Sequence, residues 1–87
     1  MKDAMEDHHQ FMQRAIELAR QTAIIERAGG PFGCVIVRGG QIIAEGVNRV
    51  LAEQDPTCHG EVAAIRAACK KLNSHDLSGC TLYTSCE

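Results

Sequence analysis

The sequence predicts an α/β protein in which helices cover a small sheet. Hydrophobic residues recur first with a helical period, then with a strand pattern around a paired-glycine turn, and then with a helical period again. A short apolar-polar strand pattern ends the chain. Hydrophobic residues make up 45% of the sequence but aromatic residues only 3%. Aliphatic side chains must therefore fill the interior, as is usual where helices pack on a sheet.

The first helix is expected from about His8 to Arg27. Its apolar side chains form one stripe with a second stripe beside it: Phe11, Ala15, Leu18 and Thr22, then Met12, Ile16, Ala19 and Ala23. That spacing indicates a helix that packs one side on a sheet. His8 and His9 are adjacent and therefore point in different directions, which favours a solvated N-terminal turn over a metal site.

A β-hairpin is expected after Gly29-Gly30-Pro31, which ends the helix. Its strands run from Phe32 to Val37 and from Ile42 to Asn48, because the paired glycines between them supply the positive φ of a tight hairpin. Counting back from those glycines gives the expected cross-strand pairs: Val37 with Ile42, Val35 with Ala44, and Phe32 with Val47. Phe32 and Asn48 should therefore emerge together at the open end of the hairpin.

The second half of the chain predicts a loop over residues 50–57, a second helix and a third strand. The helix is expected from about His59 to Leu72, with Thr57 as N-cap and Asn73 as C-cap. Its apolar face is read as Val62, Ile65, Ala68, Cys69 and Leu72. The third strand is expected from Cys80 to Ser85.

The strand-helix-strand order predicts a crossover unit, so the third strand should run parallel to the second. Both strands then finish at the end of the sheet where the second helix begins. Four side chains and the last residues through Glu87 should meet there: Phe32, Asn48, His59 and Glu61. Ligands of α/β sheets bind at the carboxyl ends of strands, so this end is the expected site.

His59 and Glu61 are the chemically suggestive pair at this end. A helix N-terminus disfavours a protonated imidazole, and a neutral imidazole is what a metal ion binds. Glu61 is too near in sequence to be assumed a second ligand and is better placed to move protons on a metal-bound water. By itself the His-x-Glu spacing is weak, because a surface histidine followed by a glutamate that favours a helix N-terminus gives the same pattern.

Composition excludes several classes of function. The net charge is −2 with no basic stripe, which argues against nucleic-acid binding. No apolar run reaches membrane-spanning length, and the N-terminus lacks the apolar core of a signal peptide. The five cysteines are odd in number and irregularly spaced, which predicts a reduced, cytoplasmic chain. A thiol redox protein is disfavoured because no C-x-x-C pair occurs.

The segment Thr57-Cys58-His59-Gly60-Glu61-Val62-Ala63-Ala64-Ile65 resembles the zinc-dependent nucleobase and nucleoside deaminases of the cytidine deaminase-like superfamily. The resemblance also includes Gly30-Pro31-Phe32-Gly33, Asn48 and the segment Leu82-Tyr83-Thr84-Ser85-Cys86-Glu87, and it is strongest to guanine deaminases. It implies an α-β-β-α-β portion of a three-layer α/β/α sandwich, with residues 1–87 forming one incomplete deaminase domain.

The resemblance also implies roles for four residues. His59 corresponds to the zinc-binding histidine and Glu61 to the proton shuttle. Asn48 corresponds to an asparagine that hydrogen-bonds the base, and Phe32 to a residue that packs on the base plane. Without the resemblance, Asn48 reads equally well as a turn residue and Phe32 as ordinary core. Cys58 and Cys86 are interpreted as non-ligands.

Family members continue after the position of Glu87 with Pro-Cys-x-x-Cys, so two cysteine ligands for Zn²⁺ are expected beyond Glu87. The implied reaction is hydrolytic deamination of a purine, guanine first, with cytosine, cytidine or adenosine as alternatives. We expect a homodimer or homo-oligomer, and the 87-residue chain alone to be impaired. The alternative is a non-catalytic module that uses the free edge of its third strand to oligomerise or bind a partner.

Overall fold

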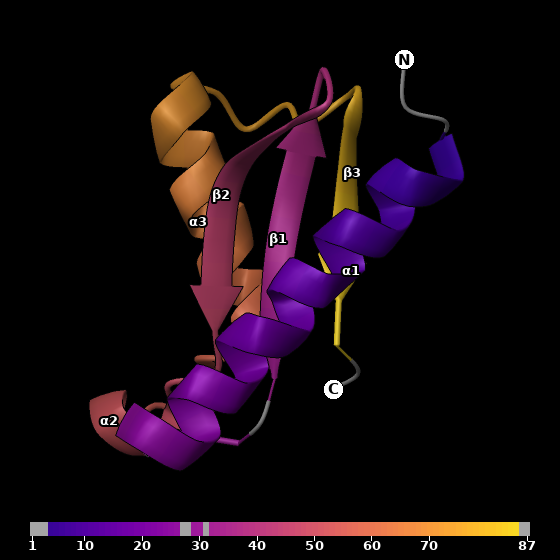
Figure 1. Cartoon of the computed structure of the whole chain (residues 1–87). Helices are drawn as coiled ribbons and strands as arrows, with labels where there is room; N and C mark the ends of the chain where they lie inside the picture. Colours follow the sequence, from indigo (N-terminus) through magenta and orange to yellow (C-terminus); the bar gives the residue numbers. More distant parts are fainter. Residues whose placement is uncertain (1–3, 27–28, 31, 86–87) are drawn as a thin grey trace.

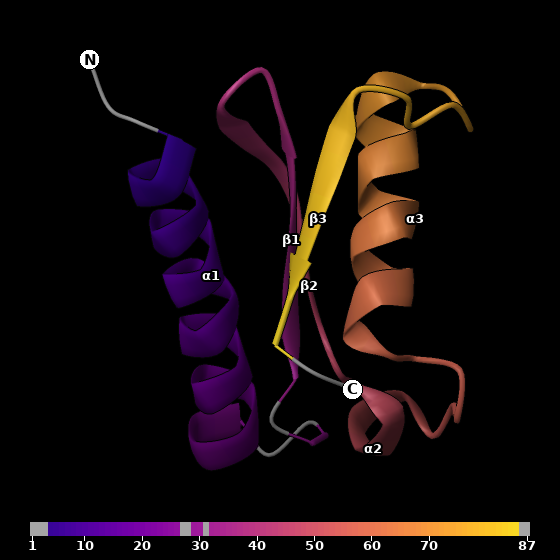
Figure 2. The ribbon, with the colours of Figure 1, turned by 90° about the vertical axis from the view of Figure 1, so that its right-hand side faces the viewer.

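The computed structural model describes residues 4–26, 29–30 and 32–85. In chain order its elements are α1 (Ala4–Arg20), the π-helix η1 (Gln21–Glu26), β1 (Gly33–Arg38), β2 (Gln41–Val47), α2 (Val50–Glu53), α3 (Gly60–Leu72) and β3 (Cys80–Thr84). Helix α1 covers one face of the sheet and α3 covers the other (Figures 1 and 2). The predicted α/β class and its three layers are therefore confirmed.

The sheet in the described part of the chain has the order β2-β1-β3. Strand β1 is antiparallel to both of its neighbours, so β2 and β3 run in the same direction, as predicted. They are not adjacent, because the hairpin holds β2 on one side of β1 and the α3 crossover delivers β3 to the other. Both of the strands that end at the expected site are thus edge strands of this part of the sheet.

The hairpin register departs from the prediction. Val37 pairs with Ile42 as expected, but a bulge follows, and the next pair joins Ile36 to Ala44. The predicted Val35–Ala44 and Phe32–Val47 pairs are therefore wrong by one residue, because one extra residue of β2 is taken up at the bulge. At the open end of the hairpin, the Asn48 backbone N–H now donates to the Phe32 carbonyl at 3.1 Å.

Helix α1 packs on the sheet with the first predicted stripe. The four side chains of this stripe are buried, and Ala19 of the second stripe is buried with them: Phe11, Ala15, Leu18, Thr22 and Ala19. Ile16 from the second stripe is 54% exposed. The Arg14 guanidinium contacts Glu45 of β2 through two hydrogen bonds, at 2.6 and 3.0 Å, and lowers the pKa of that carboxyl group. Arg27, the predicted last residue of this helix, lies outside the described residues.

The end of the first helix is π-helical rather than α-helical. Thr22 is only 1% exposed, and its hydroxyl group donates to the Leu18 carbonyl at 2.9 Å. A single helix was predicted through this segment, because apolar periodicity does not distinguish the two helix types over six residues. The segment predicted as a loop after β2 likewise contains the short helix α2. In the described part of the chain, every helix is too short or too polar to cross a membrane.

Helix α3 begins and ends near the predicted residues, and Asn73 is its C-cap in the left-handed conformation, as expected. Its buried face differs from the prediction. Ala68 is buried as predicted, but the other buried residues are Gly60 and Ala64, and the predicted Ile65 is 39% exposed. The smallest side chains face the sheet because α3 lies so close to β2 that larger ones do not fit between them.

Gly46 of β2 marks the closest approach of the sheet to α3. A Cβ atom on Gly46 would lie 2.2 Å from the Gly60 carbonyl oxygen and 2.4 Å from the Ala64 nitrogen. We therefore expect Gly46→Ala to destabilise the protein by about 2–3 kcal/mol, because the helix must move away from the strand. Urea denaturation measures the change. Gly40→Asn is the control, since Gly40 has φ +77° and no atom near its Cβ position. Equal stability of the two variants would contradict the close packing.

Candidate active site

Three backbone hydrogen bonds gather the predicted site at one end of the sheet. The first joins Asn48 to Phe32. The next residue, Arg49, donates its N–H to the Cys58 carbonyl at 2.9 Å, which holds the end of β2 against the approach to α3. Ser85 donates to the Gly33 carbonyl at 2.9 Å, which holds the end of β3 beside the start of β1. Figure 2 shows the ends of β2 and β3 at the same end of the molecule as the first turn of α3.

His59 occupies the N-cap position of α3 in an extended conformation, with φ −77° and ψ 155°. The predicted N-cap, Thr57, lies two residues too early. Imidazole Nδ1 of His59 lies 3.5 Å from a carboxylate oxygen of Glu61, and the two side chains are 46% and 35% exposed. A ring nitrogen and a carboxylate are therefore presented side by side at an open helix N-terminus.

The turn before His59 is organised by Asp55. Its Oδ1 accepts hydrogen bonds from the Thr57 backbone N–H at 2.9 Å and from the Thr57 hydroxyl group at 2.7 Å. These bonds lower the pKa of Asp55. Thr57 thus supports the turn rather than the helix. The Cys58 thiol lies 3.5 Å from the other Asp55 oxygen. Burial and this carboxylate raise the pKa of Cys58, which favours the neutral thiol.

Asn48 lies at the end of β2 and is only 6% exposed. Its side-chain Oδ1 accepts hydrogen bonds from the backbone N–H groups of Gly30, at 3.3 Å, and Val50, at 3.2 Å. Within the described residues no partner is found for Nδ2, and no fully buried polar side-chain atom there lacks a partner. Nδ2 therefore keeps some contact with solvent. Phe32 lies beside it and is half-buried.

The described residues do not complete a zinc site by themselves. No group of three or more histidine, cysteine, aspartate or glutamate side chains lies close enough to hold a metal ion in this part of the chain. Zinc takes three or four protein ligands, and His59 supplies one nitrogen donor of a suitable type. Cys86, which was interpreted as a non-ligand, lies outside the described residues.

The sequence did not predict the residues whose hydrogen bonds fix the predicted site residues in place. Gly30 and Val50 fix the Asn48 side chain through their backbone N–H groups. The Ser85 hydroxyl group accepts a hydrogen bond from the Gly33 N–H at 2.9 Å. The glycine pair before β1 was read as a helix breaker, and Gly30 also as part of the family resemblance, but neither interpretation gave the pair a role in holding Asn48. Backbone donors carry no signature of their own, so only the pairing of two glycines pointed to a close approach there.

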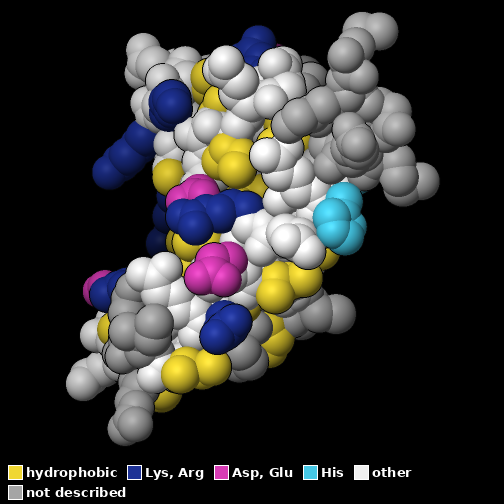
Figure 3. Space-filling view, viewed as in Figure 1, with side chains coloured by type: hydrophobic (Ala, Val, Ile, Leu, Met, Phe, Trp, Pro, Cys, Tyr) yellow, Lys and Arg dark blue, Asp and Glu magenta, His cyan; other side chains and the backbone are white. Residues whose placement is uncertain are grey.

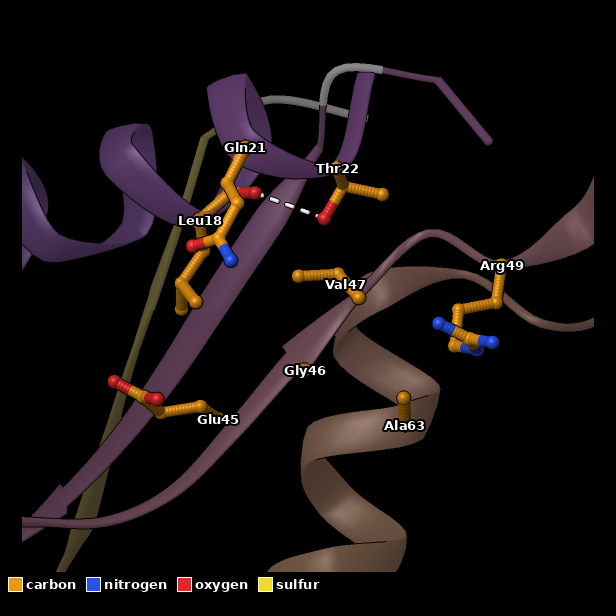
Figure 4. Close-up of a pocket in the computed structure, with 8 residues that line it drawn as sticks. All are labelled: Leu18, Gln21, Thr22, Glu45, Gly46, Val47, Arg49 and Ala63. Carbon is orange, nitrogen blue, oxygen red and sulfur yellow. Dashed lines mark hydrogen bonds between the residues drawn. The ribbon is translucent and has the colours of Figure 1, made fainter. Parts of the chain in front are cut away.

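A separate cavity lies at the outer edge of β2. It has a volume of about 280 Å³ and lies between α1, η1 and α3 (Figure 4). Its lining comprises Leu18, Gln21, Thr22, Glu45, Gly46, Val47, Arg49 and Ala63. None of the four predicted site residues lines it, so it is distinct from the candidate active site.

On the face shown in Figure 3, charged side chains of both signs lie among hydrophobic ones, and near the middle of that face basic and acidic groups lie side by side. This mixture agrees with the small net charge of −2. Exclusion of nucleic acid and a cytoplasmic location stay predictions.

The whole length of the described fold matches a known family. A family model described as the cytidine and deoxycytidylate deaminase zinc-binding region matches residues 5–87. The chain belongs to this deaminase family. The resemblance found in the sequence is therefore confirmed, and the segment from His59 to Glu61 lies within the matched region.

Guanine deaminase of Bacillus subtilis is 53% identical over 81 residues, which cover 93% of this chain and 51% of that protein. The crystal structure of that enzyme superposes with a TM-score of 0.88 and covers 92% of this chain and 50% of its own. A tRNA-specific adenosine deaminase of Aquifex aeolicus is 39% identical over 77 residues, covering 88% of this chain and 50% of that protein. The chain thus spans about half the length of these relatives.

Proposed function

We propose that this chain provides one half of a zinc-dependent hydrolytic deaminase that acts on a purine base, with guanine as the first candidate. One observation carries the proposal. A chain that is 53% identical to a guanine deaminase places His59 and Glu61 side by side, 3.5 Å apart, at the helix start that faces the end of the sheet. The fold, the matched family and this pair of side chains all support the same chemistry.

His59 is the proposed first ligand of the zinc ion. Its ring stands at the N-cap of α3, and an imidazole nitrogen is a common zinc ligand. The remaining ligands are proposed to be the two cysteines of the Pro-Cys-x-x-Cys motif that the family resemblance places after Glu87. When bound, zinc supplies a water molecule whose pKa is lowered to about neutrality.

Glu61 is the proposed proton carrier. Its carboxylate projects from the first turn of α3 beside His59 and is 35% exposed, so it can accept a proton from water and return it to the base. Protonation of the ring nitrogen beside the carbon that carries the amino group makes that carbon more electrophilic, and the hydroxide left from the water adds to it. The Glu61 carboxylate then takes the remaining proton of the added hydroxyl group and passes it to the amino group, so that the C–N bond breaks, ammonia leaves and the oxygen stays as the new carbonyl.

Asn48 and Phe32 are proposed to hold the base. The Asn48 side chain is fixed through Oδ1 and can donate from Nδ2 to the edge of a purine. Phe32 lies directly across from it and offers an apolar ring for the plane of the base. Together they provide one hydrogen-bonding group and one packing surface at the open end of the hairpin.

A second substrate class is supported by one observation, the 39% identity to a tRNA-specific adenosine deaminase. Guanine ranks first because the identity to guanine deaminase is 53% and the charge of −2 does not favour an RNA backbone. A non-catalytic module that assembles through the β3 edge is the contrasting hypothesis. A homodimer is the proposed assembly of the enzyme.

The proposed function is tested with the zinc-loaded full-length protein. By this we mean the chain extended by the Pro-Cys-x-x-Cys segment and the rest of the domain that the family resemblance places after Glu87. We expect ammonia release from guanine, with slower release or none from adenine, cytosine, cytidine and tRNA. The chain of 87 residues is assayed in parallel, and we expect it to be inactive because it holds one of the zinc ligands. Release from tRNA alone would move the assignment to adenosine. No ammonia release from any of these substrates would favour the non-catalytic module, whereas a dimer in sedimentation is expected under both hypotheses.

A further inference from the structure

We propose that the Gly29-Gly30 turn is a positioning device that locks the Asn48 carboxamide and leaves Nδ2 as the group that has no partner among the described residues. The site would then accept only a base edge that offers a hydrogen-bond acceptor to Asn48. This inference rests on the proposed function for the identity of the ligand. Its structural part, the locked side chain, stands on distances within the chain.

Two backbone donors share the side-chain oxygen of Asn48. The N–H groups of Gly30, which precedes Asn48 in the chain, and of Val50, which follows it, donate to Oδ1 at 3.3 and 3.2 Å. Rotating the carboxamide by half a turn would place its NH₂ group against both donors, and two partly buried N–H groups would lose their acceptor. Asn48 is only 6% exposed, so water cannot readily replace that acceptor. One of the two amide orientations is therefore strongly preferred.

Gly29 closes the space beside this side chain. A Cβ atom on Gly29 would lie 2.1 Å from Oδ1 of Asn48 and 2.6 Å from its backbone carbonyl oxygen. Both distances are far below van der Waals contact, and both neighbouring atoms belong to Asn48. A side chain at Gly29 must therefore displace Asn48 or the turn that holds it, which makes Gly29 a positioning residue for Asn48.

The same turn also fixes the backbone position of Phe32. The Phe32 N–H donates to the Gly30 carbonyl at 2.8 Å, and the Asn48 N–H donates to the Phe32 carbonyl at 3.1 Å. With the bond from Gly30 to Oδ1, three hydrogen bonds join Gly30, Phe32 and Asn48 in a closed ring. The group that packs on the base and the group that hydrogen-bonds it are thus held in one relative position.

The chemical consequence is a rule for the ligand. Nδ2 can donate but cannot accept, so a ring nitrogen or a carbonyl oxygen of the base satisfies it. An exocyclic amino group at the same place would bring two donors together and leave both unpaired, which disfavours that base or that orientation. The turn therefore contributes to specificity without touching the substrate.

The first test compares Gly29→Ala with Gly79→Ala in the zinc-loaded full-length protein. Gly79 has φ +80° and no atom near its Cβ position, so it reports the cost of losing a glycine far from Asn48. We expect Gly29→Ala to raise KM for guanine about tenfold and to leave kcat within about threefold, because a lost ground-state contact acts mainly on binding. Gly79→Ala should keep both constants near the wild-type values.

The second test uses guanine analogues in which one acceptor, a ring nitrogen or the carbonyl oxygen, is replaced by a carbon that cannot accept. The analogue that lacks the acceptor facing Asn48 should bind weakly to the wild type and lose no further affinity on Gly29→Ala. The other analogues should lose affinity as guanine does. This non-additivity separates loss of the Nδ2 contact from general damage to the site.

A third measurement does not depend on activity. The side-chain NH₂ signals of Asn48 are assigned in heteronuclear NMR spectra by their disappearance in Asn48→Asp. They should move in Gly29→Ala and remain in place in Gly79→Ala. Unchanged signals with an unchanged KM would overturn the lock. Moved signals in a protein that deaminates no purine would support the lock and reject the proposed function.

Discussion

Replacing Glu61 with glutamine should reduce deamination by the full-length protein by about a thousandfold or more. Glutamine has nearly the same shape and keeps its place on the first turn of α3, but it cannot take up and return a proton. Since His59 remains 3.5 Å away and unaltered, zinc binding should persist. The loss should therefore fall on kcat, with KM changed little. Steady-state kinetics and zinc content on the same preparation measure both effects.

The matched control is Glu17→Gln, which removes a carboxylate from the exposed side of α1. It should keep the wild-type rate. A Glu61→Gln variant with more than about a tenth of wild-type kcat would be incompatible with a proton carrier at this position. A variant that loses zinc as well would indicate that Glu61 serves the metal ion instead.

Replacing His59 with alanine should remove the zinc ion from the full-length protein. We expect zinc to fall from about one equivalent to a small fraction, because two thiolates cannot complete a site that needs three protein ligands. Activity should fall with it and should not return at neutral pH on adding moderate zinc. Atomic absorption on protein of confirmed mass gives the zinc content. Circular dichroism checks that α3 is retained, which we expect because the His59 side chain does not cap the helix with a hydrogen bond.

His75→Ala provides the comparison, since His75 is exposed in the connection between α3 and β3 at the other end of the molecule. It should retain zinc and activity. Full zinc content in His59→Ala would show that the metal ion is held elsewhere. The result would also undermine the proposed pairing of His59 with Glu61.

Several elements could be predicted because their signals are local. The stripe from Phe11 to Leu18 follows from a period of 3.6 residues, and the hairpin turn follows from two glycines with positive φ. The direction of β3 follows from the crossover rule. The register beyond the turn could not be predicted, because periodicity does not mark the extra residue that β2 takes up between Ile42 and Ala44. The exposure of Ile65 has the same cause, because periodicity marks an apolar side but not how closely a helix approaches.

For the site, the sequence by itself determined the residue types that carry the chemistry, the helix start that presents His59 and Glu61, and the family. These depend on neighbours within a few positions of the chain, where covalent spacing sets geometry. The hairpin pattern also predicted that Asn48 lies near Phe32, as the backbone bond between them confirms. Only the tertiary structure decided that the Asn48 oxygen is taken by Gly30 as well as by Val50. The contact with Gly30 joins residues from separate segments, and its distance results from packing turn and strand together at the end of the sheet.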